Sequence, residues 1–511
     1  MKELSRTDFE HLGEDILRSP LFNADLAPVP EAKRNWTTYN FAALWISMAH
    51  CIPTYMLAGG LIAVGMNWAE ALFTIGLGNL IVLVPILLNA HAGTKYGIPF
   101  PVLARSSFGT NGAQVPAMLR ALVACGWFGI QTALGGAAVR GFIEGIWPEF
   151  AQLGGGVEVL SGLTLPSALT FILFWALQLL IIYRGMNAVR IFENWAAPLV
   201  LVMAAVLLWW MVDRAGGFGP LMDAPSKLTA PGSFIKVFVP SLTAMIGFWA
   251  TLSLNIPDFT RYGRSQKEQM VGQALGLPTT MIAFSAMGVM ITSAAAVVLK
   301  GVAPGELWDP IAVLKYITSA VPPPGLTAPL IESDIVRLSV SIIAVVGVLM
   351  ATVSVNIAAN VVSPANDFAN LAPRRISFKT GGLITGVVGV AMHPWLLVAD
   401  PTIYIFDWLI GYSALLGPIA GIMIADYWLL RGRTLNVGDL YRPLGEYRGV
   451  NVVAVLALVA GVLPNLPGFL AAVHLVKDVP PFYTELYVYA WFTGTLVAGT
   501  LYLVGMKLRR G

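Results

Sequence analysis

Long apolar segments alternate with short clusters of charged residues from one end of the chain to the other. As a helix, an apolar segment of about 20 residues is long enough to cross the hydrocarbon core of a bilayer. The pattern therefore predicts twelve membrane-spanning helices. Their approximate centres are Cys51, Leu80, Gly129, Trp175, Met203, Met245, Ser285, Val346, Val388, Ser413, Gly461 and Thr495.

Positive charges fall unevenly on the segments between these helices. If the amino terminus is inside the cell, 23 of the 31 Lys and Arg residues lie in segments that face inward. The other eight are Arg140, Arg214, Lys227, Lys236, Lys300, Lys315, Arg337 and Lys477. Since inward loops of membrane proteins are enriched in Lys and Arg, we expect both termini in the cytoplasm and an even number of spans.

Composition supports a membrane protein and excludes several other classes. The chain has 511 residues, of which 57% are hydrophobic and only 12% charged, and its mean hydropathy is +0.72. A soluble protein of this length needs more charge to cover its surface. A net charge of +3 without a basic, aromatic-rich stretch gives no sign of nucleic-acid binding. Cys51 and Cys125 lie within apolar segments and predict no disulfide framework.

The stretch "SMAHCIPTYMLAGG", Ser47 to Gly60, interrupts the first apolar segment with residues that suit a helix poorly. Pro53 removes a backbone donor and disfavours helical geometry at Ile52, and two glycines follow. Membrane transporters use discontinuous helices to expose backbone groups to a polar ligand at mid-membrane. We therefore expect a broken helix here, although a simple proline kink is the alternative.

A second weak point lies in the sixth predicted span, at Gly247-Phe248-Trp249, with Pro257-Asp258 closing the segment. Breaks in spans one and six suggest two five-helix repeats of opposite orientation. On this basis we divide the chain into a cytoplasmic arm (1–39), a first repeat (40–214), a second repeat (232–430) and a segment with two additional helices and a cytoplasmic end (431–511).

Polar residues inside the predicted spans mark candidate ligand contacts. In the third span Trp127 and Gln131 are four residues apart and share a helix face. In the eighth span Asn356 and Asn360 are related in the same way. Intramembrane amides are costly unless they have partners, so they indicate a functional site or bonds between helices. Both alternatives remain open for each pair.

These residues suit a flat, neutral ligand with amide groups at its edge. Indoles stack on its faces, and carboxamides donate to and accept from its N–H and C=O groups. The sequence has no nucleotide-binding loop, metal-ligand cluster or nucleophile elbow, so a membrane enzyme has little support. A channel would need a pore lined by charge rings or a carbonyl filter, and no such pattern is present.

Several longer motifs resemble those of the nucleobase–cation symporters of the hydantoin, allantoin and uracil permease type. They are "NADLAPVPEAKRNWTTYNFAALW", "HAGTKYGIPFPVLARSSFG", "WFGIQT", "LNIPDFTRY", "SVNIAANVVSPAND" and "GPIAGIMIADYWLLR". The stretches "IPTYMLAGGLIAVG" and "LNIPDFTR" are most similar to bacterial allantoin permeases. The resemblance implies an all-α fold with twelve transmembrane helices, a five-plus-five inverted repeat, and discontinuous helices 1 and 6.

The resemblance also implies roles for single residues. Trp127 and Trp249 would stack on the ligand, and Gln131 and Asn360 would bind its amide edge. Phe248 would contribute backbone contacts. Cys51 stands where relatives carry Gln or Asn, and a thiol is a weaker hydrogen-bonding group, so this departure bears on the identity of the ligand. Asn356 completes our set of candidate substrate residues.

A sodium site of related symporters maps to the backbone of Ser47, His50 and Ala351 and to two hydroxyl positions, which here are Ser354 and Val355. Val355 offers no oxygen, although hard cations prefer oxygen ligands. The Ser47 hydroxyl is a possible replacement. His50 titrates near neutral pH in water and would make the site respond to protons, or it is simply a neutral, hydrogen-bonded helix residue.

We expect a secondary transporter of the inner (plasma) membrane that imports allantoin by cation-coupled alternating access. Uracil, a hydantoin or another nucleobase is the alternative substrate. Its partners would be the small-molecule substrate, a coupling H+ or Na+ and the bilayer, and no cofactor or nucleic acid is expected. We expect it to work as a monomer. The glycine pairs Gly382–Gly386 and Gly417–Gly421 predict close helix contacts.

Overall fold

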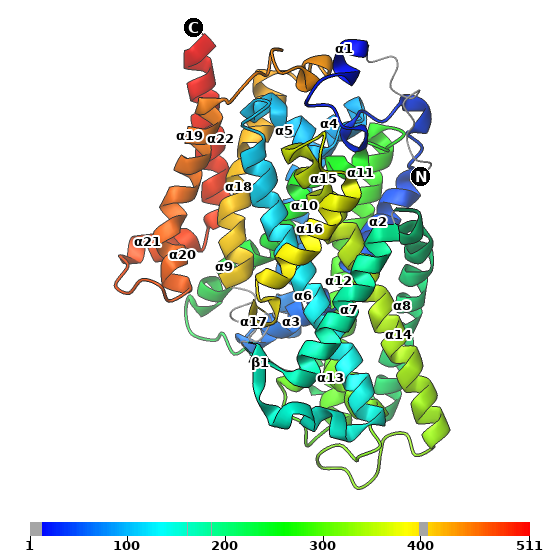
Figure 1. The fold of residues 1–511 in the computed structure, drawn as a ribbon. Coiled ribbons are helices and arrows are strands. Elements are labelled where there is room, and N and C mark those ends of the chain that lie inside the picture. Colours follow the sequence, from blue (N-terminus) through cyan, green and yellow to red (C-terminus); the bar gives the residue numbers. More distant parts are fainter. Residues whose placement is uncertain (1–12, 161, 185, 398–406, 511) are drawn as a thin grey trace.

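The computed structural model describes residues 13–160, 162–184, 186–397 and 407–510 of the chain. Within these ranges the protein is a body of long helices packed side by side, with one small two-stranded ribbon at one end (Figure 1). The first twelve residues of the predicted cytoplasmic arm lie outside the described ranges.

The first half of the chain begins with short turns and continues in long helices. The elements are α1 (Glu14–Leu17), the 3-10 turns η2 (Ala24–Leu26) and η3 (Glu31–Lys33), α2 (Thr38–Ala49), α3 (Ile52–Ala63), α4 (Trp68–Tyr96), α5 (Phe100–Phe108), α6 (Gln114–Ile146), η4 (Pro148–Gly156), β1 (Glu158–Leu160), β2 (Leu163–Thr164), α7 (Leu165–Arg184), α8 (Met186–Ala215) and η5 (Pro220–Met222). Strands β1 and β2 pair antiparallel.

The second half has the same character. Its elements are α9 (Ser233–Phe248), α10 (Ala250–Asn255), α11 (Pro257–Thr260), α12 (Gln266–Val298), η6 (Glu306–Trp308), α13 (Pro310–Thr318), α14 (Asp334–Asn360), α15 (Val362–Leu371), α16 (Phe378–Ala391), α17 (Pro394–Leu397), α18 (Ile410–Ile424), the π-helical turn η8 (Ala425–Leu430), η9 (Gly438–Tyr441), α19 (Val452–Val462), η10 (Leu463–Asn465), α20 (Leu466–Ala472), α21 (Pro481–Tyr487) and α22 (Ala490–Arg510).

The helices agree with the predicted spans. Among the described residues, seven helices are long and apolar enough to cross a membrane, or nine if the bent pairs α2–α3 and α21–α22 each count as one span. The shorter apolar helices α9 and α16 and the 30-residue α8 lie at the remaining predicted spans. All twelve predicted centres fall on these segments, with Cys51 at the break between α2 and α3.

Local sequence signals explain where several helices begin and end. Asn67 and Glu70 form a reciprocal capping box at the start of α4, and Gly97 ends that helix in the left-handed region at φ 71°. Ser265, Ser333 and Ser377 cap α12, α14 and α16 by accepting a backbone N–H.

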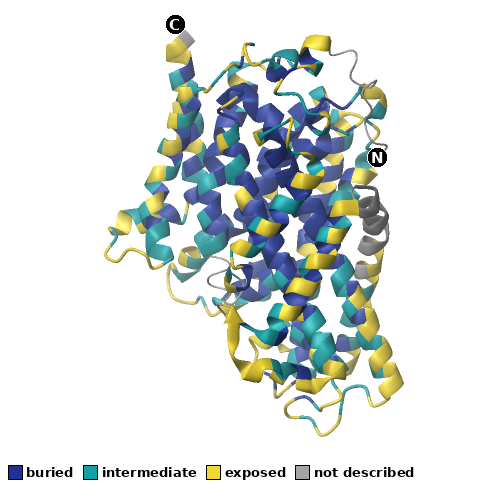
Figure 2. Ribbon diagram, viewed as in Figure 1, coloured by how far each residue is buried: buried dark blue, intermediate teal, exposed yellow. Residues whose placement is uncertain are grey.

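Buried residues are concentrated in the middle of the body and exposed residues around it (Figure 2). Helix α7 illustrates the division. Leu169, Leu173 and Leu180 are exposed on one face, whereas Thr170 and Gln178 are buried on the other. Since this protein has the helices of a membrane protein, the exposed leucines are those that face lipid, and the polar groups face the other helices.

Both predicted glycine pairs lie at close helix contacts, which confirms them. A Cβ atom at Gly421 would stand 2.1 Å from the carbonyl oxygen of Thr495 on α22. At Gly386 it would stand 2.4 Å from the side chain of Leu179 on α7. At Gly421 the neighbouring backbone leaves no room for a side chain, whereas at Gly386 the neighbour is the end of a leucine side chain.

The end of the body that holds α1 and the carboxyl-terminal end of α22 also buries two arginines (Figure 1). Arg105 and Arg120 are among the 23 Lys and Arg residues that the sequence assigned to inward-facing segments, and their side chains are buried within the body. Arg105 donates to the Asn370 side chain at 2.6 Å and to the Leu440 carbonyl at 2.9 Å. Burial lowers the pKa of Arg105 to about 10, so it remains charged at neutral pH.

The amino-terminal arm, residues 13–37, crosses this end of the body. The Tyr441 hydroxyl donates to the Leu26 carbonyl at 2.7 Å, and the Asn23 side chain donates to the Pro373 carbonyl at 2.8 Å. Arg261 donates to the Asp25 carbonyl at 2.8 Å. The arm therefore joins the end of α11, the segment after α15 and the segment before α19.

Candidate functional site

The first predicted break is present. Helices α2 and α3 meet at an angle of 60°. Cys51 lies between them in an extended conformation, with φ −138° and ψ 161°, and Pro53 stands in the first turn of α3. Because His50 also leaves helical geometry (φ −85°, ψ 70°), the last carbonyls of α2 have no following helical turn to bond with. A broken helix, rather than a simple kink, is therefore the correct interpretation of this stretch.

The second predicted break is smaller. Helix α9 ends at Phe248, and Trp249 leaves helical geometry (φ −109°, ψ 11°) before α10 begins at Ala250. The change of direction turns the Phe248 and Trp249 side chains into the interior, where both are buried.

An aromatic cluster forms where α6, α9 and α18 meet. The ring of Phe248 packs edge-on against Trp127, with centroids 5.3 Å apart, and against Trp249, with centroids 5.0 Å apart. Trp45 of α2 packs edge-on against Trp249 at 5.1 Å. The two predicted stacking tryptophans are thus joined through the side chain of Phe248, for which the resemblance implied only backbone contacts.

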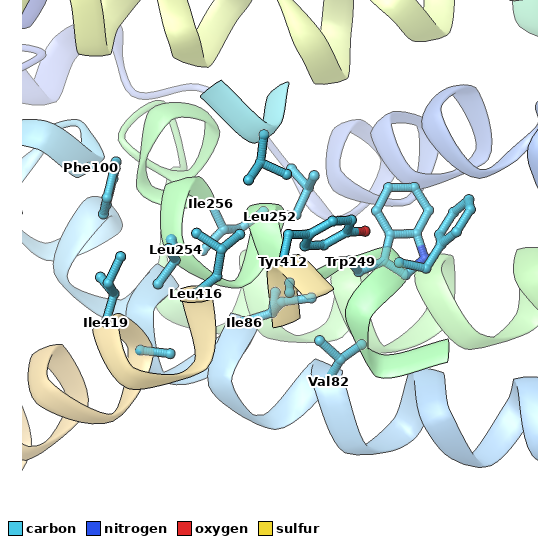
Figure 3. Close-up of a cluster of buried hydrophobic side chains, with 14 of the residues drawn as sticks. Val82, Ile86, Phe100, Trp249, Leu252, Leu254, Ile256, Tyr412, Leu416 and Ile419 are labelled. Carbon is cyan, nitrogen blue, oxygen red and sulfur yellow. The ribbon is translucent and has the colours of Figure 1, made fainter. Parts of the chain in front are cut away.

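Tyr412 of α18 adds a polar group that the sequence did not indicate. The Trp127 indole N–H donates to the Tyr412 hydroxyl at 3.3 Å. In Figure 3 the Tyr412 ring lies within the cluster of buried side chains, and its hydroxyl points toward the Trp249 end, away from Leu254, Leu416 and Ile419. A tyrosine in an apolar span looks like an ordinary core or interface residue, which is why sequence reasoning did not single it out.

Amide and indole groups with unused hydrogen-bonding capacity lie beside these rings. The Cys51 thiol lies beside Gln131, and its hydrogen-bond partner is the Thr54 hydroxyl at 3.3 Å. Among the described residues, the Gln131 carbonyl oxygen and the Trp249 indole N–H are buried without a partner. Because burying an unpaired polar group is costly, one free acceptor and one free donor in an aromatic enclosure indicate a place for a ligand.

The two asparagines of α14 lie on one face, as their spacing predicts. The Asn360 amide donates to the Asn356 carbonyl oxygen at 2.9 Å, and the Asn356 amide donates to Gln178 of α7 at 2.6 Å. Asn356 therefore bonds between helices, which is the alternative the sequence left open for it. A direct ligand contact of Asn356 or Asn360 stays a prediction.

The residues proposed for a cation also come together in part. The Ser47 and Ser354 hydroxyl oxygens are 3.2 Å apart, and Ala351 precedes Ser354 by one helical turn. The side chain of Val355 packs in the hydrophobic core. His50 packs edge-on against Phe284 with centroids 4.2 Å apart, and its Nε2 has no partner among the described residues. Two neighbouring hydroxyls beside a break in a helix offer oxygen ligands of the kind that a hard cation prefers.

The whole site is closed to solvent in this conformation. The exposed fractions of Cys51, Trp127, Gln131, Phe248 and Trp249 are 5% or less. Beyond Gln131, α6 continues to a cavity of about 350 Å³, which Leu134, Arg140, Glu144, Lys315 and Trp395 help to line.

A charged cluster that the sequence did not predict lies toward the other end of α6. The Arg120 guanidinium is 3.5 Å from the Asp367 carboxylate of α15, and neither side chain is exposed. Asp258 of α11 accepts the Phe100 backbone N–H at 2.9 Å, and its other oxygen has no hydrogen-bond partner among the described residues. The sequence signal for this cluster is Arg120, an arginine near the start of a predicted span. An arginine that lies at the membrane surface gives the same sequence pattern, so the signal does not identify a buried ion pair.

Comparisons with known proteins agree with this geometry. A family model described as "Permease for cytosine/purines, uracil, thiamine, allantoin" matches residues 28–494. A purine-uracil permease of Arabidopsis thaliana is 42% identical and covers 95% of this chain and 78% of its own length. An allantoin permease of Bacillus subtilis is 40% identical and covers 96% of this chain and 94% of its own length.

A solved structure extends the likeness to the fold. A nucleobase-cation-symport-1 family transporter, in a closed conformation with bromovinylhydantoin bound, matches this structure with a TM-score of 0.71 and 27% sequence identity. The match covers 96% of each chain. This agreement, together with the breaks in the first and sixth spans, confirms the expected polytopic all-α transporter fold.

Proposed function

This chain belongs to the family of permeases for cytosine and purines, uracil, thiamine and allantoin, and from this premise we propose that it imports allantoin together with a cation. It is a membrane transporter of this family and not an enzyme. The observation that carries the substrate class is the enclosed aromatic cluster, in which Gln131 offers a free acceptor and Trp249 a free donor. A neutral ring with N–H and C=O groups at its edge complements that pair.

In this proposal Trp127 and Trp249 cover the faces of the substrate ring, and the Phe248 side chain moves to admit it. Gln131 and Asn360 bind the amide edge. Allantoin carries a five-membered ring of two N–H and two C=O groups with a ureido side chain, so it presents several donors and acceptors in one plane. The allantoin permease of Bacillus subtilis, similar along nearly the whole chain, supports this substrate.

A purine or uracil is the second candidate. The permease of Arabidopsis thaliana with those substrates in its name is 42% identical to this chain. Cys51 is the residue that bears on the choice between allantoin and a nucleobase. Its thiol lies beside Gln131, at a position where a carboxamide side chain would offer stronger hydrogen bonds to the substrate.

For the coupling ion we propose Na+ at the break of α2. The Ser47 hydroxyl lies 3.2 Å from that of Ser354, a spacing at which both oxygens can contact one ion, so Ser47 supplies the oxygen that Val355 lacks. Carbonyl groups of Ser47, His50 and Ala351 complete the proposed set. A proton acting at His50 is the alternative.

Uptake of labelled allantoin into proteoliposomes tests both proposals, with competition by unlabelled uracil, hydantoin and cytosine and with sodium and pH gradients imposed separately. We expect saturable uptake driven by sodium and competed weakly by uracil. Trp127→Ala should abolish uptake, whereas Trp147→Ala, at an exposed tryptophan outside the cluster, should not. Stronger competition by uracil would move the substrate to a nucleobase, and uptake driven by pH alone would overturn the sodium proposal.

A further inference from the structure

Behind the ligand face of α6, four residues form a closed ring of hydrogen bonds. The Phe128 backbone carbonyl accepts from the Thr132 hydroxyl at 2.7 Å and from the Asn356 side-chain amide at 3.1 Å. The Gln178 side-chain amide donates to the Thr132 hydroxyl oxygen at 3.0 Å. The Asn356 amide donates to the Gln178 carbonyl oxygen at 2.6 Å and closes the ring. Helices α6, α7 and α14 each contribute.

The ring permits only one direction of donation. A backbone carbonyl can only accept, so both Thr132 and Asn356 must turn donors toward Phe128. The single hydroxyl proton of Thr132 is then used, and its oxygen can only accept from Gln178. Gln178 consequently turns its own oxygen toward Asn356, whose N–H₂ group serves both Gln178 and Phe128. Reversing either amide would oppose oxygen to oxygen or N–H to N–H.

Asn360 receives this orientation from the ring. The Asn356 oxygen is the one group left to face Asn360, and the Asn360 amide donates to it at 2.9 Å. The Asn360 carbonyl oxygen is thereby turned away from the ring, and no described residue donates to it. The side chains that hold Asn360 in this orientation are fully buried, namely those of Thr132, Gln178 and Asn356. Asn360 itself is 6% exposed and so has some accessible surface.

We propose that Gln178, with Thr132, is a positioning residue that fixes Asn360 as a hydrogen-bond acceptor toward the substrate, so that the permease selects rings presenting an N–H group at that point. The proposal rests on the proposed function, because it takes Asn360 as a substrate contact. Gln178 itself does not touch the substrate. It determines which end of the Asn360 amide is offered.

The test compares hydantoin rings in which one N–H at a time is replaced by oxygen, such as oxazolidine-2,4-dione, or is methylated. Affinity is measured by competition with allantoin uptake. In the unmodified protein, loss of the N–H that Asn360 binds should weaken competition by roughly 5- to 150-fold, because the buried acceptor is left unpaired. In Asn360→Ala, removing that N–H should no longer weaken competition. The ring position at which the penalty disappears is therefore the position that Asn360 binds.

Gln178→Leu and the milder Thr132→Val should reduce the same penalty to within about threefold of none. The shorter bond to Gln178 is lost or loosened, the longer 3.1 Å bond to the Phe128 carbonyl alone holds Asn356 less firmly, and Asn360 can turn its N–H₂ group toward the ligand. A purely structural role predicts something different: affinity for every ring would fall in parallel and the penalty would persist. That result would overturn the proposal. Gln273→Leu is the matched control, since Gln273 is equally buried and hydrogen-bonded within α12.

Gln178→Glu supplies a rescue that a structural role would not produce. In its neutral form a carboxyl group has one donor and one acceptor, and so preserves both ring contacts. Ionisation removes the donor. The acceptor that Asn356 uses is present in both forms, so discrimination between the paired rings should be retained in this variant at acidic and at neutral pH, whereas it is reduced in Gln178→Leu. Unchanged discrimination in Asn360→Ala would instead contradict Asn360 as a substrate contact, and absence of any ring competition would contradict the proposed function.

Discussion

The indole N–H of Trp127 donates a hydrogen bond to an acceptor on a helix far away in sequence. Tyr412 supplies that acceptor from α18 at 3.3 Å. The Trp127–Gln131 spacing made these two residues predictable as one face of a helix. No spacing rule connects them to Tyr412, because that contact exists only once α6 and α18 pack.

Tyr412→Phe should weaken allantoin binding by about 1 kcal/mol, or roughly fivefold, because the buried Trp127 N–H loses its acceptor. Equilibrium binding to the purified protein measures the change. Tyr55→Phe is the matched control: it removes a buried hydroxyl bonded to Thr292 at 2.9 Å, outside the aromatic cluster, and should leave affinity unchanged. Equal effects in both variants would contradict a specific role for Tyr412.

Asp367→Asn should destabilise the protein by about 3–5 kcal/mol, because it leaves the Arg120 charge buried without its partner. Asp258, the other carboxylate whose charge acts on Arg120, does not replace the lost contact. The thermal unfolding midpoint in detergent measures the loss, and the double variant Arg120→Met, Asp367→Leu should recover most of it. Asp334→Asn breaks a pair with Arg337 in which the carboxylate is exposed to solvent, and it should change stability by less than about 1 kcal/mol.

Among the elements, the breaks in the helices differ in how far the sequence could predict them. Pro53 and the following glycines mark the break between α2 and α3 directly, since their backbone effects are local. The end of α14 at Asn360 has a local signal that the sequence analysis did not use. Pro364, four residues later, lacks the N–H that would bond the Asn360 carbonyl, and its ring crowds that carbonyl. Val361, between α14 and α15, has φ −115° and ψ −46°.

Two glycine positions, one in α18 and one in α6, offer a test of helix packing in which substitution by alanine should have opposite effects on stability. Gly421→Ala should lower stability by about 1–3 kcal/mol, since its Cβ would stand 2.1 Å from the Thr495 carbonyl oxygen. Gly145→Ala in α6, where no atom lies within 4 Å of the added Cβ, should be neutral or stabilising by up to about 1 kcal/mol. Thermal unfolding in detergent distinguishes the two. A stabilising effect at Gly421 would show that α18 and α22 can separate without cost.

At the scale of the whole molecule, the distribution of Lys and Arg predicts the orientation in the membrane. In the structure α1 and the carboxyl-terminal end of α22 lie at one end of the body, and β1 and α13 lie at the other (Figure 1). Hydropathy alone was sufficient for the number and order of the spans, because it depends on segment length and composition. The enclosed site was predictable only through its α6 and α14 spacings, while the contacts that assemble it depend on packing.

Cysteine labelling in intact cells measures this orientation. We expect a membrane-impermeant thiol reagent to label Val157→Cys, at an exposed position beside β1, and to spare Leu444→Cys, which is 86% exposed at the opposite end. Permeabilised cells should label both. The native Cys51 and Cys125 are buried and give the background in the unmodified protein. The reverse pattern would place both termini outside.

The arm that crosses the end of the body also sets an order of events during biosynthesis. Its residues leave the ribosome first, yet Leu26 is bonded by Tyr441, 415 positions later, and Asn23 by the carbonyl of Pro373. Val29 can bond the Gly97 carbonyl as soon as α4 is complete, but the contact at Tyr441 can form only after ten of the expected twelve spans have been made. Complete docking of the arm is therefore a late step, and full resistance of the arm to proteolysis would report that a nascent chain has been assembled beyond Tyr441.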